Sequence, residues 1–269
     1  MQIHTLKTVR IAVLLALFVT ASGVAQVGIG TAAPEGMLDL ESSTTGLVYP
    51  RVALIKTDQE APVTNPNGGN LVAGTVVYNT STTSTGDHDV YPGIYAWDGS
   101  AWVPQFILEH SALFEQNALD YRVPLSGGYR NVPGLDNESF TAKYTGTYRI
   151  EANFNFGAGF VDNPDSGEEI RMATQEGYFR FSFNGDNYDI YTHSYSINND
   201  IIPADFNTFR HDSSLILYVD LRAGQSYPLS LQMDVQVSNN SDYNNGSNNA
   251  ESHVGIGIPC SIEFTYIKE

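Results

Sequence analysis

The sequence contains a single cysteine, and this shortage excludes one common way of stabilising an exported protein. Cys260 has no second cysteine to pair with, so the chain forms no internal disulfide. It shares alternate positions with Ile262, Phe264 and Tyr266 in a strand-like segment, which predicts a buried thiol that packs as a small hydrophobe. A disulfide between two copies of the chain is the alternative.

Positive charge is also scarce. The chain has 13 Lys and Arg against 30 Asp and Glu, which gives a formal net charge of -17. A surface of this sign repels phosphate backbones and anionic lipid headgroups. We therefore expect no nucleic-acid partner and no attachment to a membrane surface.

Long hydrophobic runs are missing from most of the chain, and the one exception stands at its start. Lys7 and Arg10 precede the apolar run Ile11 to Val19, and small residues follow up to Ala25. This order predicts a secretory signal peptide over residues 1–25, cleaved near Ala25. The run is shorter than the roughly 20 residues that span a bilayer, and no cysteine stands near the cleavage site for a lipid anchor. We expect a protein without membrane insertion that is secreted or held at the cell surface.

Helical periodicity is scarce, whereas strict alternation is common. In the stretch from Glu138 to Phe156 the apolar residues are all even-numbered, and from Phe140 onward the polar residues are odd-numbered, which is the period of a strand with one face on a core. Gly146 interrupts the run. The pattern therefore predicts two strands, 140–143 and 147–156, that face the same core.

The same alternation recurs in later segments up to the last strand. Phe179, Phe181 and Phe183 precede an "NGDN" turn, and Leu215, Leu217, Val219 and Leu221 precede a "RAGQ" turn. Many strands at regular spacing predict an all-β chain, with an antiparallel sandwich over residues 111–269.

Some of these strands carry apolar residues on both faces. Ile216 and Tyr218 alternate with Leu215 and Leu217. In the neighbouring hairpin the pattern assigns Phe179, Phe181 and Tyr191 to one face, and Tyr178, Tyr188 and Ile190 to the other. A sandwich strand has one inner face, so a second apolar face needs cover. A neighbouring copy in a homotrimer would supply it.

Residues 26–110 have a different texture, rich in Gly, Thr and Pro with short apolar segments, which predicts a small, irregular, β-rich and stalk-like region. The sequence Asp98-Gly99-Ser100 indicates a hairpin that sets Trp97 opposite Trp102. Such a pair is either a local core or, as the alternative, a platform on which a sugar stacks.

Motifs that carry chemistry are few. "GIGTAA" matches a dinucleotide fingerprint, but Pro34 stands where the helix should run. The histidines have no metal-ligand spacing, and the adjacent His211, Asp212 and Ser213 do not form a triad merely by being neighbours. We expect no catalytic residues, no cofactor and no enzymatic activity.

Calcium is the one ion that the loops suggest. Oxygen-rich loops offer Asp186, Asp189 and Asp242 as candidate ligands, and calcium prefers six to eight oxygen ligands. Solvated turns are the simpler interpretation of the same loops.

The alternating segment resembles the globular head of complement C-one-q, a member of the tumour necrosis factor jelly-roll superfamily. Phe140, Gly146 and Tyr148 stand at the spacing of its signature, whereas Ile150, Ala152 and Pro133 replace expected aromatic residues. The resemblance covers about residues 111–269. It implies a jelly-roll sandwich and a homotrimer.

The region before it is similar to secreted Bacteroidetes-type surface proteins and to phage tail-fibre-like segments, through "VGIGT", "LDLESSTTGLVYPRV" and "PGIYAWDGSAWV". That similarity implies an exported protein of a Gram-negative bacterium. Two functional hypotheses follow. The first is a trimeric, non-enzymatic head for adhesion or recognition of an extracellular protein or glycan. The second is an exported carbohydrate-binding or carbohydrate-active sandwich.

Overall fold

The structure is a computed structural model that describes residues 26–125, 127–162, 169–199, 205–236 and 251–268. The predicted signal peptide lies outside these residues and stays a prediction. The chain divides into two compact units, one up to Tyr49 and one from Pro50 to Glu269. The described residues contain strands and turns but no helix, which confirms the all-β prediction. This part of the chain accordingly has no helix that could span a membrane.

The first unit has one small parallel pair, β1 (Val27–Ile29) with β2 (Leu38–Leu40). Gly28 of the "GIGTAA" motif lies inside β1 and pairs with Asp39. A dinucleotide site needs a strand, a glycine turn and then a helix. No helix follows here, so the motif does not form that site.

The second unit begins with a small sheet in the order β3 (Arg51–Val52), β4 (Val76–Asn79), β5 (Gly93–Trp97) and β6 (Trp102–Pro104). Its core combines three aromatic residues, Tyr95, Trp97 and Trp102, with four aliphatic ones, Leu54, Leu71, Val77 and Val90. Asn79 is fully buried among them. Its Oδ1 accepts from Leu54 N at 3.0 Å and its Nδ2 donates to Tyr91 O at 2.8 Å, which satisfies a polar group that burial would otherwise penalise.

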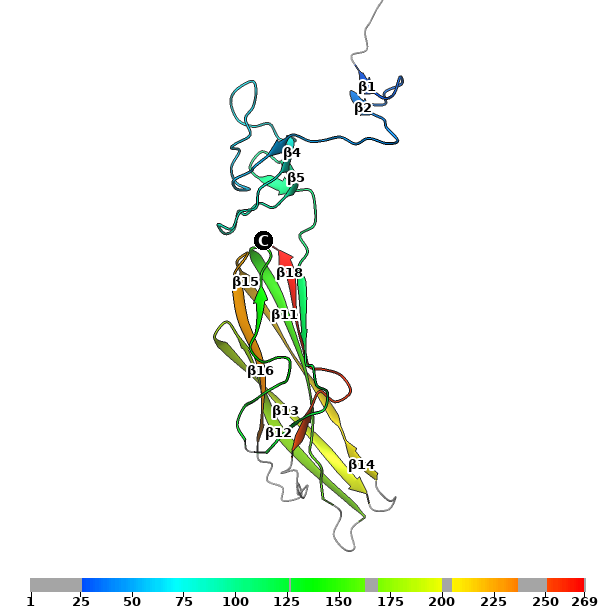
Figure 1. The fold of residues 1–269 in the computed structure, drawn as a ribbon, viewed down its shortest axis with the longest axis vertical. Helices are drawn as coiled ribbons and strands as arrows, with labels where there is room; N and C mark the ends of the chain where they lie inside the picture. Colours follow the sequence, from blue (N-terminus) through cyan, green and yellow to red (C-terminus); the bar gives the residue numbers. More distant parts are fainter. Residues whose placement is uncertain (1–25, 126, 163–168, 200–204, 237–250, 269) are drawn as a thin grey trace, which may run out of the picture. The chain divides into compact units, whose positions relative to one another are not determined.

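The rest of the second unit is a sandwich of two mainly antiparallel sheets (Figure 1). The first sheet, which we call the β11 sheet, has β11 (Gly146–Gly157) between β18 (Ser261–Lys268) and β15 (Arg210–Leu221). Beyond β18 lies β7 (Ser111–Glu115), and β17 (Ser252–Val254) with β8 (Tyr121–Val123) continues the same edge.

The second sheet, which we call the β12 sheet, runs in the order β10 (Glu138–Thr141), β16 (Ser226–Gln236), β12 (Ile170–Phe183), β13 (Asp186–Asn199) and β14 (Asp205–Thr208). A two-residue strand, β9 (Arg130–Asn131), pairs with β16. The chain thus crosses between the sheets from β8 to β9, from β10 to β11, from β11 to β12, from β14 to β15, from β15 to β16 and from β16 to β17. The resulting orders, 7-18-11-15 and 10-16-12-13, form the eight-stranded jelly roll that was expected.

The two strands predicted around Gly146 lie in different sheets. Phe140 of β10 and Tyr148 and Ile150 of β11 are all buried in one core, because the two strands face each other across the sandwich. Phe140 stacks on Phe264 of β18 with ring centroids 4.1 Å apart. Alternation established which side chains point inward but not which sheet each strand joins.

The β12–β13 hairpin corrects one prediction about faces. Asn184 and Gly185 form its two-residue turn with φ of 50° and 95°, and Phe183 pairs with Asp186. This register pairs odd-numbered residues with even-numbered ones, so parity reverses across the turn. Tyr188 and Ile190 therefore pack against the core beside Phe181 and Phe179, whereas Tyr191 lies on the outer face with Tyr178.

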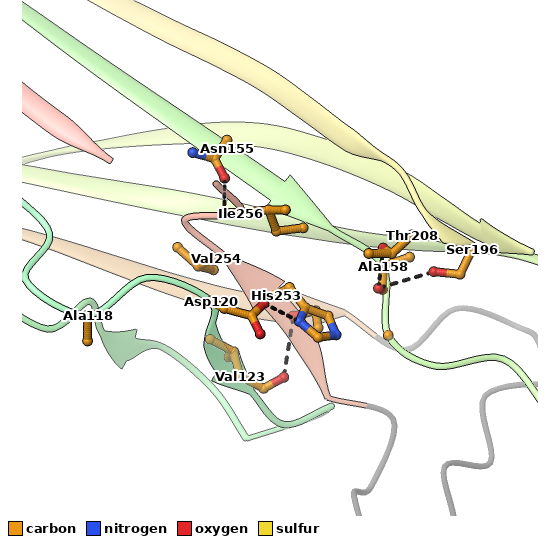
Figure 2. A network of polar contacts seen from close by, with 12 residues as sticks. Ala118, Asp120, Val123, Asn155, Ala158, Ser196, Thr208, His253, Val254 and Ile256 are labelled. Atoms are coloured by element: carbon orange, nitrogen blue, oxygen red, sulfur yellow. Dashed lines mark hydrogen bonds and ion pairs between the residues drawn. The ribbon is translucent and has the colours of Figure 1, made fainter. Parts of the chain in front are cut away.

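One end of the core is apolar and the other is polar. On the inner face of β13, Thr192, Ser194, Ser196 and Asn198 are buried in succession. Ser196 Oγ and Thr208 Oγ1 both donate to the carbonyl of Ala158, at 3.2 and 2.8 Å (Figure 2). These two hydroxyls, of which that of Ser196 is buried, therefore hold the segment that follows β11 by its backbone.

A buried aspartate joins the small sheet to the sandwich. Asp89 is 1% exposed. Its Oδ2 accepts from Thr145 Oγ1 at 2.8 Å, and its Oδ1 accepts from Thr85 N at 2.7 Å and from Thr83 Oγ1 at 3.0 Å. Thr145 Oγ1 in turn accepts from Ala223 N at 3.1 Å. The loop before β5 is thus hydrogen-bonded to two turns of the sandwich.

Candidate functional site

Trp97 and Trp102 face each other as the sequence predicts. They are directly paired between β5 and β6, with ring centroids 5.4 Å apart. Trp97 is 3% exposed and Trp102 is 1% exposed, and Trp102 Nε1 donates to Gln59 O at 2.8 Å. A sugar stacks only on a ring face that solvent can reach. The pair therefore forms the core of the small sheet, which is the first of the two interpretations.

The calcium candidates are not brought together in the described residues. Asp189 accepts two hydrogen bonds from Arg180, at 2.7 and 2.8 Å, and these bonds hold the pKa of Asp189 below its ordinary value. Asp186 lies at the exposed turn of the hairpin, and Asp242 lies outside the described residues. Nowhere in the described ranges do three or more His, Cys, Asp or Glu side chains gather as a metal would require.

The most dyad-like contact is formed by His253 and Asp120, whose Nδ1 and Oδ1 atoms are 2.6 Å apart (Figure 2). Ser252 beside it is fully buried and its hydroxyl donates to Val123 O at 3.3 Å, so it is not available as a nucleophile. Asn155 Oδ1 accepts from Ile256 N at 2.7 Å in the same region. These contacts fix the backbone where the edge formed by β17 and β18 is interrupted.

The three neighbouring residues of the types found in a catalytic triad do not point to a common site. His211, Asp212 and Ser213 lie in β15, where successive side chains point to opposite faces. The His211 ring is hydrogen-bonded through Nδ1 to His193 O at 2.6 Å, and Asp212 pairs with Arg210 at 2.9 Å. His211 and Asp212 are therefore engaged in contacts that hold the strand in place.

Cys260 is fully buried, as its parity predicts, beside Ile262 and Phe264. Burial raises the pKa of its thiol to about 12. A neutral thiol without solvent access is neither a nucleophile nor a partner for a disulfide between surfaces.

An exposed apolar surface lies on the outer side of the β11 sheet. Ile216 is 49% exposed and Tyr218 is 65% exposed, and they pair with Glu151 and Arg149 of β11. Leu113 in β7 and Ile267 in β18 are also about half exposed on this side. We call this set of residues the β15 face.

A second exposed surface lies on the outer side of the β12 sheet. It is an aromatic stripe, defined here as Tyr178, Tyr191, His193, Tyr195 and Phe209. The stripe continues through ring contacts: Tyr178 with Tyr191 at 5.6 Å, Tyr191 with His193 at 5.8 Å, and Tyr195 with Phe209 at 4.5 Å. Parity alone did not reveal this surface, because the hairpin register had first to be known.

Comparison with protein families finds one match, to a family described as the phage tail like trimerisation region, over residues 28–113. The match covers β1 to the first residues of β7, so it reaches the start of the sandwich. This is less than half of the chain. The comparison with curated proteins finds no match.

Two solved structures to which this chain has a likeness are distant from it in sequence. The Eiger TNF of S. frugiperda is 12% identical with a TM-score of 0.30, and the match covers 60% of this chain and 94% of that one. A β-fructofuranosidase of Schwanniomyces occidentalis is 10% identical with a TM-score of 0.18, over 72% of this chain and 40% of the enzyme. At scores this low neither likeness informs the activity of this protein, and the chain matches less than half of the enzyme.

Proposed function

We propose that this protein is an exported, non-enzymatic trimeric module whose jelly-roll domain serves adhesion or recognition. The observation that carries the proposal is the match of residues 28–113 to a phage tail like trimerisation region. Because the match runs into β7, three copies joined there would hold three sandwiches next to one another without a long linker.

The β15 face supports the same proposal. Monomeric proteins seldom leave large apolar side chains exposed together, and Ile216 and Tyr218 are exposed in the middle of a long strand. A copy of the chain held nearby would cover them. Closed threefold symmetry also leaves no free surface from which a fibre could grow.

Export is part of the proposal and rests on the order of charge, apolar run and small residues in the first 25 positions. The excess of 30 Asp and Glu over 13 Lys and Arg suits a protein that binds other extracellular molecules and not nucleic acid. Secreted material should begin near Gln26 when its N-terminus is sequenced.

The experiment is a measurement of mass by light scattering on the secreted full chain and on the double variant Ile216→Glu/Tyr218→Glu. We expect a threefold mass for the parent. If residues 28–113 alone hold the trimer, the variant keeps this mass. If the β15 face contributes, the trimer of the variant dissociates at a higher protein concentration than the trimer of the parent. A monomeric parent at micromolar concentration contradicts the proposal.

A further inference from the structure

The aromatic stripe contains an open corner made by two tyrosine rings. Tyr178 of β12 and Tyr191 of β13 are directly paired, their ring centroids are 5.6 Å apart and their planes meet at 63°. Tyr178 is 38% exposed and Tyr191 is 47% exposed. The two rings therefore meet edge to face, and both are partly open to solvent.

Carboxylates border this corner. Glu176 lies two residues before Tyr178 on the same outer face, and it is paired with His193, two residues after Tyr191. Burial and then the negative charge of Glu176 raise the pKa of Tyr191. Asp234 of β16 lies directly across from Tyr178 on its other side. The corner therefore combines ring faces with negative charge.

On the same face of the sheet, a neighbouring tyrosine and carboxylate bind a cationic side chain. Arg180, two residues beyond Tyr178, lies over the ring of Tyr129 at 3.9 Å and bonds Asp189 through two nitrogens. A guanidinium is thus fixed between a tyrosine and a carboxylate. Among the described residues a cation lies over Tyr78, Tyr129 and Tyr144, whereas Tyr178 and Tyr191 have none.

We propose that the corner formed by Tyr178, Tyr191 and Glu176 binds an arginine or lysine side chain of a basic segment of another protein. A cation over an aromatic ring is attracted by the ring quadrupole, and Glu176 supplies the opposite charge. With 30 acidic against 13 basic residues, the chain as a whole also draws cationic partners toward it.

The inference does not depend on the trimer. The stripe lies on the outer side of the β12 sheet and the β15 face on the outer side of the β11 sheet, so the corner shares no residue with the β15 face. If the chain does form a trimer, three corners would act together and strengthen binding to a partner with repeated basic segments.

The test uses the full-length secreted protein and a labelled nine-residue peptide of alternating arginine and glycine, with fluorescence anisotropy at low ionic strength. The double variant Tyr178→Ala/Tyr191→Ala should weaken binding about tenfold, and Glu176→Gln should weaken it several-fold. Tyr178→Phe/Tyr191→Phe keeps both rings and should retain most of the affinity. Glu109→Gln removes one exposed charge elsewhere and is the matched control.

Three outcomes would overturn the inference. If the ring-deleted variant binds as tightly as the parent, only the overall charge attracts the peptide. If a peptide of serine and glycine binds equally well, the stripe is an apolar surface without preference for cations. If a cationic oligosaccharide binds at the corner and the arginine peptide does not, the partner is of another class. The phenylalanine and glutamine variants keep the test valid even if the alanine variant does not fold.

Discussion

At the scale of single residues, Asp89 shows how one side chain can determine whether two parts of a chain act together. Burial alone would raise its pKa, but hydrogen bonds from the Thr85 backbone and from the Thr145, Thr83 and Thr85 hydroxyls hold the pKa below its ordinary value. The ionised form is therefore preferred in the folded protein. It accepts every one of these bonds without donating any.

Replacing Asp89 by Asn puts an NH₂ group among hydroxyl and amide donors. We expect a loss of about 1–3 kcal/mol in the free energy of unfolding at neutral pH. Because the folded pKa is lowered, the contribution of Asp89 is complete above its unfolded pKa and disappears as the pH falls through the folded one. The difference between parent and variant in urea melts should therefore narrow below about pH 4.

Asp87→Asn is the matched control, since Asp87 lies in the same loop and is exposed. It should change the urea midpoint little at any pH. An equal loss in both variants would show that loop charge, and not the hydrogen bonds of Asp89, is responsible.

At the scale of secondary-structure elements, the alternation of the sequence predicted the inner face of single strands well, because side chains on a strand alternate strictly. It predicted Phe140, Tyr148 and Phe154 as core residues, and all three are buried. It failed for Tyr188, Ile190 and Tyr191. The length of the turn determines whether odd- or even-numbered residues of the second strand face the core, and the alternation does not give that length. The aromatic stripe was missed for this reason.

Buried polar strands were beyond such prediction as well. Thr192, Ser194, Ser196 and Asn198 are polar, yet all four are buried. Ser194, Ser196 and Asn198 hydrogen-bond backbone carbonyls of other segments, whereas the Thr192 hydroxyl has no partner among the described residues. Ser194 donates to Phe209 O, and Asn198 Nδ2 donates to Val161 O at 3.3 Å. Partners that come from distant segments leave no local pattern.

The turn that reverses parity is itself open to test. Gly185 has a φ of 95°, where a Cβ is strained, so Gly185→Ala should lower the free energy of unfolding by about 1–2 kcal/mol. Asn184 also has positive φ, at 50°, and Asn184→Gly should change stability by only a few tenths of a kcal/mol. Thermal melts of both variants measure the difference. Equal effects would mean that the turn does not hold the hairpin in this register.

At the scale of the whole molecule, the trimerisation match and the β15 face make one joint prediction about stability. A contact that exists only between folded copies stabilises the folded state by mass action. The midpoint of thermal unfolding should therefore rise with protein concentration for the parent. It should rise less for Ile216→Glu/Tyr218→Glu, in which two carboxylates would be buried in the contact.

For this comparison Glu138→Gln is a suitable control, because Glu138 lies in β10 of the other sheet and should leave the concentration dependence unchanged. If the midpoint of thermal unfolding of the parent does not change with protein concentration, contacts between folded sandwiches do not stabilise the protein.

The burial of Trp97 and Trp102 has an optical consequence. They are the only two tryptophans of the chain, and both lie in the core of the small sheet. The sandwich contains tyrosine and phenylalanine but no tryptophan. Excitation at the red edge of the absorption band, where tyrosine is silent, therefore makes the small sheet alone emit. The protein carries its own reporter, with which melting of the small sheet can be followed separately from that of the sandwich beside it.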